Sequence, residues 1–184
     1  MPDTFLYFAY GSNMLTERLR ARCPSAAPRG VATAPGYALE FTKRSVDGSA
    51  KATLVADGTS GAAVPGVLFE IARADLPHLD AAEGVGIGYD RYDAFRVMRH
   101  ADNAPMIAAT YLAPARARDG SLVAFDWYVA LALAGALQHR LPAAHVAALR
   151  RTMMQPDPHG RRATRLEAVA VLREAGFAHL LDLG

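Results

Sequence analysis

Two short segments of this chain combine residue types that can bind an anion and move a proton. The first is Tyr10-Gly11-Ser12-Asn13-Met14, which follows the apolar stretch 5–9. We expect a strand to end there and a helix to begin, because the N–H groups and peptide dipoles at a helix start favour an anion or a developing oxyanion. Its glycine permits close approach to the backbone, and its serine or asparagine is a suitable N-cap. This turn is a candidate substrate-binding site, with a plain capped helix as the alternative.

The second segment has the sequence Leu-Asp-Ala-Ala-Glu-Gly-Val and ends at Val85. Gly84 stands where a left-handed C-cap would end a short helix that begins near Asp75. Glu83 then lies in the last helical turn, where the macrodipole disfavours a negative charge by a few tenths to about 1 kcal/mol. Apolar neighbours such as Leu79, Val85 and Ile87 would further disfavour the charged form if the side chain is buried. Glu83 is therefore a candidate general acid/base, and a solvated carboxylate is the alternative.

Other catalytic patterns in the sequence are less convincing than these two segments. Asp80 and Glu83 share a helix face like a pair of glycosidase carboxylates, but a solvated face is the commoner reason for such spacing. The alternating glycines of 84–88 resemble a dinucleotide fingerprint in the wrong context, after a helix and before a strand, so we expect a flexible lid over Glu83 instead. Ser12 lies outside a Gly-x-Ser-x-Gly elbow, and the lone Cys23 has no histidine nearby in sequence. The spacing of the histidines predicts no metal site.

The elements that must position these residues are short strands followed by helices. Alternating apolar residues predict strands over 29–34, 37–43, 50–56, 64–71, 89–98 and 106–112. Helical spacing and capping residues predict helices over 15–21, 75–83, 125–139, 142–154 and 161–175. This order predicts an α+β fold in which a small barrel or curled sheet is surrounded by helices. A Pro/Gly-containing break at 156–160 divides the chain into a main domain, 1–155, and a C-terminal helical extension, 156–184.

Composition limits the class of protein. The chain has 184 residues, is 52% hydrophobic and 21% charged, and carries a formal net charge of +2, which is too balanced to indicate a nucleic-acid partner. A single cysteine excludes an internal disulfide and favours a reducing compartment. The N-terminus lacks a signal-peptide pattern, and no stretch approaches the roughly 20 apolar residues of a membrane span. We therefore expect a cytoplasmic protein without a membrane or nucleic-acid partner.

Several pieces of the chain, in order, resemble the gamma-glutamylcyclotransferase (AIG2-like) family. The matching pieces are 7–14, 36–41, 65–69, 79–85, 88–91 and 128–142. The resemblance implies a compact, mostly antiparallel barrel with helices around it. It also implies an enzyme that converts a gamma-glutamyl amino acid or a gamma-glutamyl amine to 5-oxoproline and the free amine. A non-catalytic barrel of the same fold that binds a small acid or a partner protein is the alternative.

The resemblance also implies roles for individual residues. Glu83 would be the acid/base residue, and the turn from Tyr10 to Met14 would bind the substrate together with Tyr89 and Tyr128. Met14 stands where the family commonly has leucine, a swap of similar volume. Core packing is the alternative role for Tyr128. No cofactor is implied, and the sequence leaves open which amine departs and whether the protein forms a homodimer.

Overall fold

A computed structural model describes residues 3–183 of the chain. The start of the predicted main domain, residues 1 and 2, and the end of the predicted C-terminal extension, residue 184, lie outside the described part. The strands are β1 (Thr4–Ala9), β2 (Ala27–Pro35), β3 (Tyr37–Arg44), β4 (Ala50–Ala56), β5 (Ala63–Ala72), β6 (Asp90–Arg99), β7 (Pro105–Leu112), β8 (Ala124–Phe125) and β9 (Met154–Gln155). The α-helices are α1 (Thr16–Arg20), α2 (Leu76–Glu83), α3 (Asp126–Gln138), α4 (Ala143–Arg150) and α5 (Ala163–Glu174). Short 3-10 helices are η1 (Ser12–Met14), η2 (Arg73–Asp75), η3 (Ala115–Ala117) and η4 (Ala178–Leu183).

The centre of the fold is a closed barrel with strand order β1-β5-β2-β6-β7. All neighbouring strands are antiparallel except β7 and β1, which close the barrel as a parallel pair with Tyr7 opposite Ala109. Phe8, Val67 and Phe69 of its strands are fully buried. The predicted α+β fold with a small, mostly antiparallel barrel is confirmed.

Two of the predicted strands lie outside this barrel. β3 and β4 form a hairpin that begins a second sheet with strand order β3-β4-β8-β9, in which β8 pairs in parallel with both β4 and β9. β8 and β9 are two residues long, too short to give a periodic pattern in the sequence. This sheet forms one wall of the candidate site described below.

Helix α3 is the central helix of the molecule. Its residues from Trp127 to Ala136 are all buried, so it is covered on every side rather than on a single face. Gly135 allows this packing, since a Cβ there would lie 2.5 Å from the backbone N of Leu15 and 2.5 Å from Cβ of Met14. The close approach fixes η1 and the turn before it against α3.

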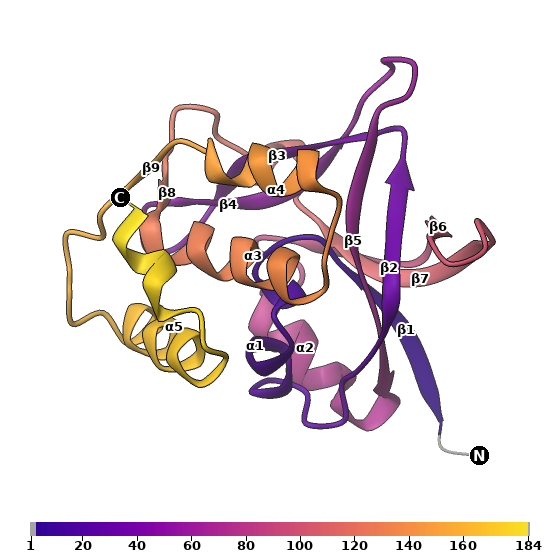
Figure 1. Cartoon of the computed structure of the whole chain (residues 1–184), viewed down its shortest axis with the longest axis horizontal. Helices are drawn as coiled ribbons and strands as arrows, with labels where there is room; N and C mark the ends of the chain where they lie inside the picture. The colour runs from indigo at the N-terminus through magenta and orange to yellow at the C-terminus, as the bar shows by residue number, and fades with distance from the viewer. Residues whose placement is uncertain (1–2, 184) are drawn as a thin grey trace.

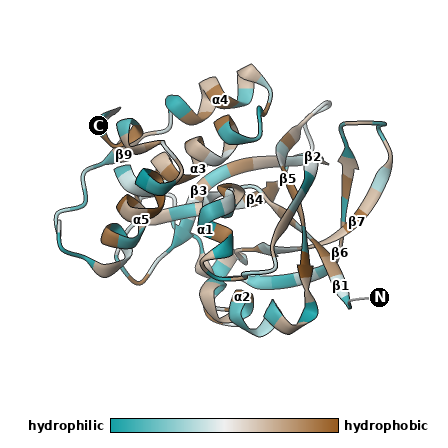
Figure 2. Ribbon diagram, turned by 60° about the horizontal axis from the view of Figure 1, so that its bottom comes forward, coloured by the Kyte–Doolittle hydropathy of each residue, from teal (hydrophilic) through white to brown (hydrophobic). Residues whose placement is uncertain are grey.

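The remaining helices gather mainly on one side of the barrel (Figure 1). α4 and α5 carry both hydrophilic and hydrophobic residues around their circumference, as helices with one face on a core should (Figure 2). The helix predicted over 142–154 ends at Arg150, because the chain then extends to pair Met154 with Ala124 of β8. α5 and η4 pack on α3, and Leu172 and Leu180 belong to the same buried core as the barrel. Within the described residues, no helix combines the length and apolar character needed to cross a membrane.

Candidate active site

A small cavity opens where the end of β1, η1, β4 and the end of α2 meet. It is lined by Tyr7, Tyr10, Gly11, Ser12, Asn13, Ala52, Glu83, Tyr89, Tyr111 and Tyr128. Every residue singled out in the sequence as a site candidate lines it except Met14. The two segments that the sequence analysis identified separately therefore share one cavity.

The turn before η1 is built around Gly11. Its φ and ψ are −121° and −139°, and a Cβ at this position would lie 3.2 Å from both the Tyr128 hydroxyl and the Ala52 Cβ. That spacing is tighter than ordinary van der Waals contact, so a side chain here would crowd the cavity. Glycine is needed at this position for close approach rather than for a left-handed backbone.

The expected capping role of the turn is wrong. The chain forms η1 first, and α1 begins only at Thr16, with Leu15 as its N-cap and no side-chain cap. The Met14 amide donates to the Gly11 carbonyl at 3.0 Å, whereas the structure gives no acceptor among residues 3–183 for the amides of residues 11–13. The amides of residues 11–13 are therefore available to an anion, whereas the amide of Met14 is already used within the turn.

Met14 lies beneath the cavity instead of lining it. Its side chain is fully buried and packs against Gly135 of α3. The assignment of Met14 as a substrate contact is therefore not supported by its side-chain position. Its contribution is to anchor the turn, which is consistent with the tolerance of this position for leucine or methionine.

Glu83 is the last residue of α2, and the predicted C-cap is confirmed at Gly84, which has φ 65° and ψ 52°. Glu83 Oε1 accepts hydrogen bonds from Arg22 Nη1 and from Asn13 Nδ2, both at 2.8 Å. Arg22 Nη1 also donates to Asn13 Oδ1 at 2.9 Å, so the three side chains form a closed network. The sequence analysis missed Arg22, which carries no motif of its own and comes 61 residues before Glu83.

The apolar surroundings expected for Glu83 are present only in part, since Leu79 is fully buried but two other expected neighbours are exposed. Val85 and Ile87 are 39% and 82% exposed and contribute little to the enclosure of the carboxylate. Buried tyrosines provide the walls of the cavity instead. The side chain of Glu83 is only 13% exposed because of them and of Arg22.

The five tyrosines of the cavity divide into two groups by their hydrogen bonds. Tyr10 donates to the carbonyl of Tyr111, Tyr89 donates to the Ala52 carbonyl at 2.6 Å, and Tyr111 donates to Asp80 Oδ1 at 2.8 Å. Their hydroxyl protons are already used within the protein. These three side chains therefore shape the wall.

Tyr7 and Tyr128 form the other group because their hydroxyl oxygens accept hydrogen bonds. Tyr7 accepts from Asn13 Nδ2 at 3.0 Å, and Tyr128 accepts from the backbone N–H of Ala52 at 3.1 Å. Each hydroxyl thus keeps a proton that it can donate to a ligand. Burial raises the pKa of Tyr7 well above its ordinary value and raises that of Tyr128, so both stay protonated. Sequence reasoning identified Tyr128 but missed Tyr7.

Several alternatives from the sequence are disfavoured by the contacts. Asp80 is engaged by Tyr111 and by an ion pair with Arg91, so it is held apart from the proton-transfer position that a glycosidase pair would require. Burial, followed by Asp75, raises the pKa of the Cys23 thiol to about 12, which leaves no reactive thiolate at neutral pH. Residues 3–183 contain no group of three or more His, Cys, Asp or Glu side chains arranged to hold a metal ion.

The glycine-rich segment after Glu83 forms a series of hydrogen-bonded turns. The amides of Ile87 and Gly88 donate to the Gly84 carbonyl at 3.0 Å, and that of Gly86 donates to the Tyr89 carbonyl at 2.9 Å. A Cβ at Gly88 would lie 2.6 Å from Cε of Lys43, so β3 packs directly against this segment. The lid role remains a prediction, but the segment clearly brings Lys43 beside the cavity.

A family model described as gamma-glutamyl cyclotransferase, AIG2-like, matches residues 7–129 and thus includes every residue that lines the cavity. The chain belongs to this family. Gamma-glutamylcyclotransferases from Homo sapiens and Bos taurus are 38% and 37% identical to it over 92 residues. Each alignment covers 47% of this chain and 47% of the relative, so the chain matches about half the length of these curated relatives.

Solved structures of the family resemble the chain over a greater length. A structure described as gamma-glutamyl cyclotransferase has a TM-score of 0.80 at 26% sequence identity, covering 94% of this chain and 99% of its own. An uncharacterized human protein has a TM-score of 0.77, also at 26% identity, and covers 91% of this chain and 99% of its own. The barrel and the helices beyond β7, including α5, are therefore shared features of the fold.

Proposed function

We propose that this protein is a gamma-glutamylcyclotransferase, which converts a gamma-glutamyl amino acid or gamma-glutamyl amine to 5-oxoproline and a free amine. The observation that carries the proposal is that Glu83 and residues 11–13 line one cavity among tyrosines, with the Asn13 side chain bonded to the Glu83 carboxylate. The names of the curated relatives and of the structure with a TM-score of 0.80 support the same activity.

The reaction is an intramolecular acyl transfer. The substrate's own α-amine attacks its γ-carbonyl carbon, a new C–N bond closes a five-membered lactam, and the bond to the departing nitrogen breaks. Holding the substrate folded back on itself supplies a proximity advantage that reaches roughly 7–11 kcal/mol for well-oriented intramolecular steps. No enzyme nucleophile is needed, which fits a site without a reactive serine or cysteine.

Glu83 moves the proton. An α-amine is largely protonated at neutral pH, so a base must take its proton before or during attack, and the same residue returns the proton to the leaving nitrogen. Arg22 and Asn13 hold the carboxylate through Oε1, which leaves Oε2 for the substrate. Asn13 therefore serves as a link between the base and the turn as well as a wall of the cavity.

The anionic parts of the substrate face the turn. The amides of Gly11, Ser12 and Asn13 bind either the α-carboxylate or the oxyanion of the tetrahedral intermediate. Tyr128 and Tyr7 donate hydrogen bonds with the protons that the protein does not use. Tyr10 and Tyr89 keep the cavity narrow, because their hydroxyls are tied to backbone carbonyls.

The test is a panel of gamma-glutamyl dipeptides and gamma-glutamyl amines, with release of 5-oxoproline measured for the intact protein and for Glu83→Gln. Turnover by the parent and its loss in the variant is the expected result. Tight binding of a substrate or of 5-oxoproline without turnover would instead identify a non-catalytic binding protein of the same fold.

The same proposal includes the cellular location of the protein and its oligomeric state. We place the protein in the cytoplasm, on the strength of its single buried cysteine and balanced charge. We propose a homodimer as the assembly. Light scattering of the purified chain measures the assembly directly.

A further inference from the structure

Lys43 is a cation at the side of the candidate site that forms no ion pair with any of residues 3–183. Its Nζ lies 4.8 Å from the centroid of the Tyr89 ring, which forms part of the cavity wall. The end of its side chain also packs against Gly88, in the segment that follows Glu83. Lys43 therefore lies beside the cavity rather than in its lining, on β3, where it contacts Tyr89 and the segment that follows Glu83.

The contacts of Lys43 contrast with those of Lys51, the other lysine of the chain. Lys51 Nζ donates to Asp47 Oδ2 at 2.8 Å and to Ser49 Oγ at 2.6 Å, so its charge is neutralised within the fold. Among residues 3–183, no carboxylate or carbonyl accepts a hydrogen bond from Lys43. A half-buried ammonium without such a partner has lost part of its hydration, and a bound anion would restore it.

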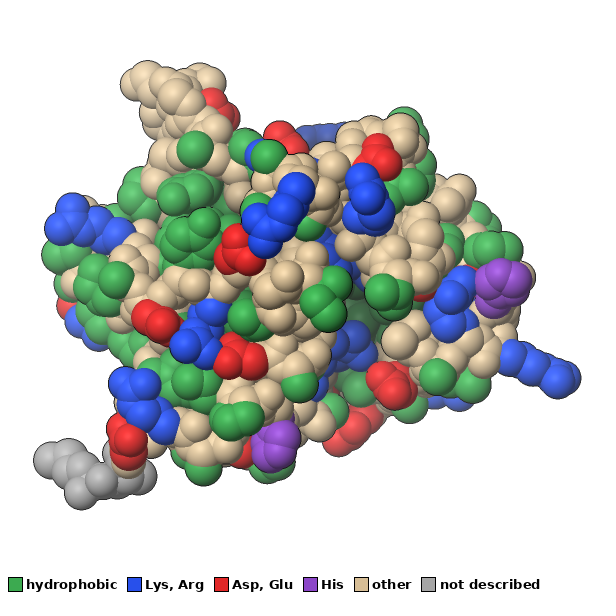
Figure 3. Space-filling model, turned by 180° about the vertical axis from the view of Figure 1, so that it is seen from behind, with side chains coloured by type: hydrophobic (Ala, Val, Ile, Leu, Met, Phe, Trp, Pro, Cys, Tyr) green, Lys and Arg blue, Asp and Glu red, His purple; other side chains and the backbone are tan. Residues whose placement is uncertain are grey.

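The charges around the cavity leave a positive surplus. Glu83 is the carboxylate that faces the cavity, and Arg22 already forms an ion pair with it. Arg18 is 8% exposed and has no hydrogen-bond partner for its buried Nε. Burial, followed by repulsion from Arg22, lowers the pKa of Arg18 to about 10, so it remains charged at neutral pH. The charge of Glu83 acts to raise the pKa of both Arg18 and Lys43, so both cations belong to its electrostatic surroundings. Figure 3 shows Lys and Arg side chains within a hollow on one face of the molecule.

A surplus of this kind fits a substrate with two carboxylates better than one with a single carboxylate. A gamma-glutamyl amino acid has one carboxylate on its glutamyl part and a second on the amino acid that leaves. A gamma-glutamyl amine lacks the second. Because Glu83 must reach the leaving nitrogen, the second carboxylate, attached to the adjacent carbon, would lie toward the end of α2, and Lys43 packs against the segment that follows it.

We propose that Lys43 is a specificity-determining residue that binds the carboxylate of the leaving amino acid, so that the substrates are gamma-glutamyl amino acids rather than gamma-glutamyl amines. This inference rests on the proposed cyclotransferase function and selects between its two substrate classes. It assigns the amides of residues 11–13 to the glutamyl end of the substrate and Lys43 to the leaving end.

The test compares gamma-glutamyl-alanine with gamma-glutamyl-alaninamide, which differ only in the second carboxylate. The intact protein should have a kcat/KM about 10- to 100-fold higher for the acid, the range expected when a charged hydrogen bond is lost. Lys43→Gln should reduce kcat/KM for the acid by about the same factor and change that for the amide by less than about threefold. Lys43→Arg, which keeps the charge, should recover part of the preference.

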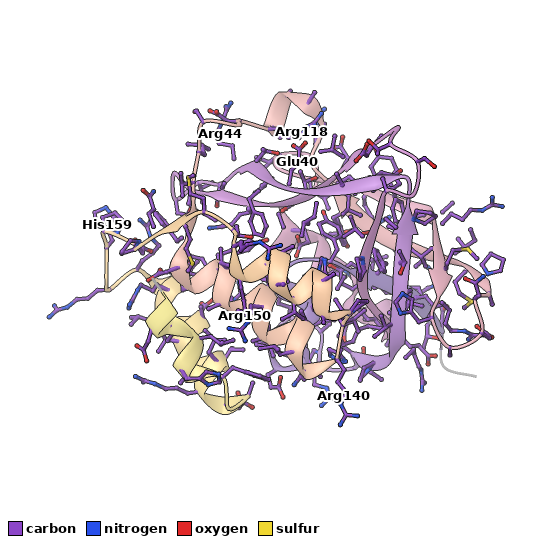
Figure 4. All side chains as sticks on the ribbon, turned by 45° about the horizontal axis from the view of Figure 1, so that its top comes forward. Glu40, Arg44, Arg118, Arg140, Arg150 and His159 are labelled. Carbon is purple, nitrogen blue, oxygen red and sulfur yellow. The ribbon has the colours of Figure 1, made fainter. Side chains whose placement is uncertain are left out.

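Arg44→Gln is the matched control because it removes one positive charge from the neighbouring position of the same strand. The side chain of Arg44 is 58% exposed and approaches only Asp119, at 3.9 Å. Figure 4 shows it at the edge of the molecule. This variant should behave like the parent on both compounds, which separates a local contact from a change in net charge.

The outcomes distinguish the inference from the function on which it rests. An equal loss on both compounds in Lys43→Gln, or a parent that does not discriminate between them, would overturn the role of Lys43 while leaving the cyclotransferase intact. If the parent releases no 5-oxoproline from either compound, the proposed function fails. Calorimetric binding of the two compounds to the parent and to Lys43→Gln then decides whether Lys43 binds the carboxylate.

Discussion

Arg22 Nη1 lies 2.8 Å from Glu83 Oε1 and 2.9 Å from Asn13 Oδ1. One guanidinium nitrogen thus ties the carboxylate at the end of α2 to the turn that precedes η1. Because the Asn13 amide also donates to Glu83, removing any one of the three side chains leaves the other two less constrained. The network explains how a carboxylate at the unfavourable end of a helix dipole is held in one position.

Replacing Glu83 with Gln should abolish nearly all turnover, with a loss of about 100-fold or more, because the amide keeps the shape but cannot exchange a proton. Release of 5-oxoproline under single-substrate conditions measures the loss. Circular dichroism should show an unchanged fold. A rate within about threefold of the parent would mean that another group is the base.

Replacing Arg22 with Ala should lower kcat by about tenfold, because the carboxylate loses its fixed orientation. Arg22→Lys, which keeps the charge but not the planar fork of donors, should recover only part of kcat. A loss of rate no larger than the loss of folded protein seen by circular dichroism would indicate that Arg22 only supports folding.

Tyr128→Phe should reduce kcat/KM by about tenfold and lower the free energy of unfolding by about 1–3 kcal/mol, because the buried Ala52 N–H loses its acceptor. Tyr89→Phe is the companion variant. It removes a hydroxyl whose proton is already given to the Ala52 carbonyl, so stability should fall while turnover stays within about threefold of the parent. Equal losses of turnover in the two variants would contradict the division between donor and wall tyrosines.

Gly135→Ala should destabilise the protein by about 1–3 kcal/mol, although the same change in an open helix interior would stabilise it by up to about 1 kcal/mol. The reason is the approach of η1, since the new Cβ would lie 2.5 Å from the Leu15 nitrogen. Thermal unfolding of this variant, compared with Gly160→Ala, where the added Cβ meets nothing within 4 Å, measures the difference. A stability equal to or above that of the parent would show that α3 and η1 can separate freely.

The pH dependence of stability should include a contribution from Asp47. Burial acts to raise the pKa of this carboxyl, but hydrogen bonds from Lys51 and Ser49 outweigh it and lower the pKa to about 2. In the unfolded chain the value is about 3.9, so the stabilisation is present above about pH 4 and is lost as the pH falls toward 2.

Urea unfolding at pH 7 and at pH 3 tests this contribution in the parent and in Asp47→Asn. The other carboxyls titrate in both proteins, so the parent should lose more stability between the two pH values than the variant does. Identical losses would show that the Asp47–Lys51 pair adds no acid-sensitive stability.

The sequence predicted the local features of the site because short-range rules govern them. A strand running into a Gly-Ser-Asn turn and a Glu-Gly pair at a helix end both follow from backbone preferences within a few residues. The same rules predicted the seven longer strands, β1 to β7, and the C-cap at Gly84. They misjudged the cap of α1, since a 3-10 turn at Ser12–Met14 is not distinguishable by composition from the first turn of an α-helix.

Only the tertiary structure decided what surrounds these segments. Arg22 and Glu83 are 61 residues apart, and the Tyr128 hydroxyl meets the amide of Ala52 across 76 residues. Lys43 lies beside the cavity because β3 and β4 leave the barrel and form a second sheet, which a strand pattern alone cannot distinguish from two more barrel strands. Whether a segment forms a helix or a strand depends on residues close together in the chain. The partners of a buried charge depend instead on which surfaces come together when the whole chain buries its apolar area.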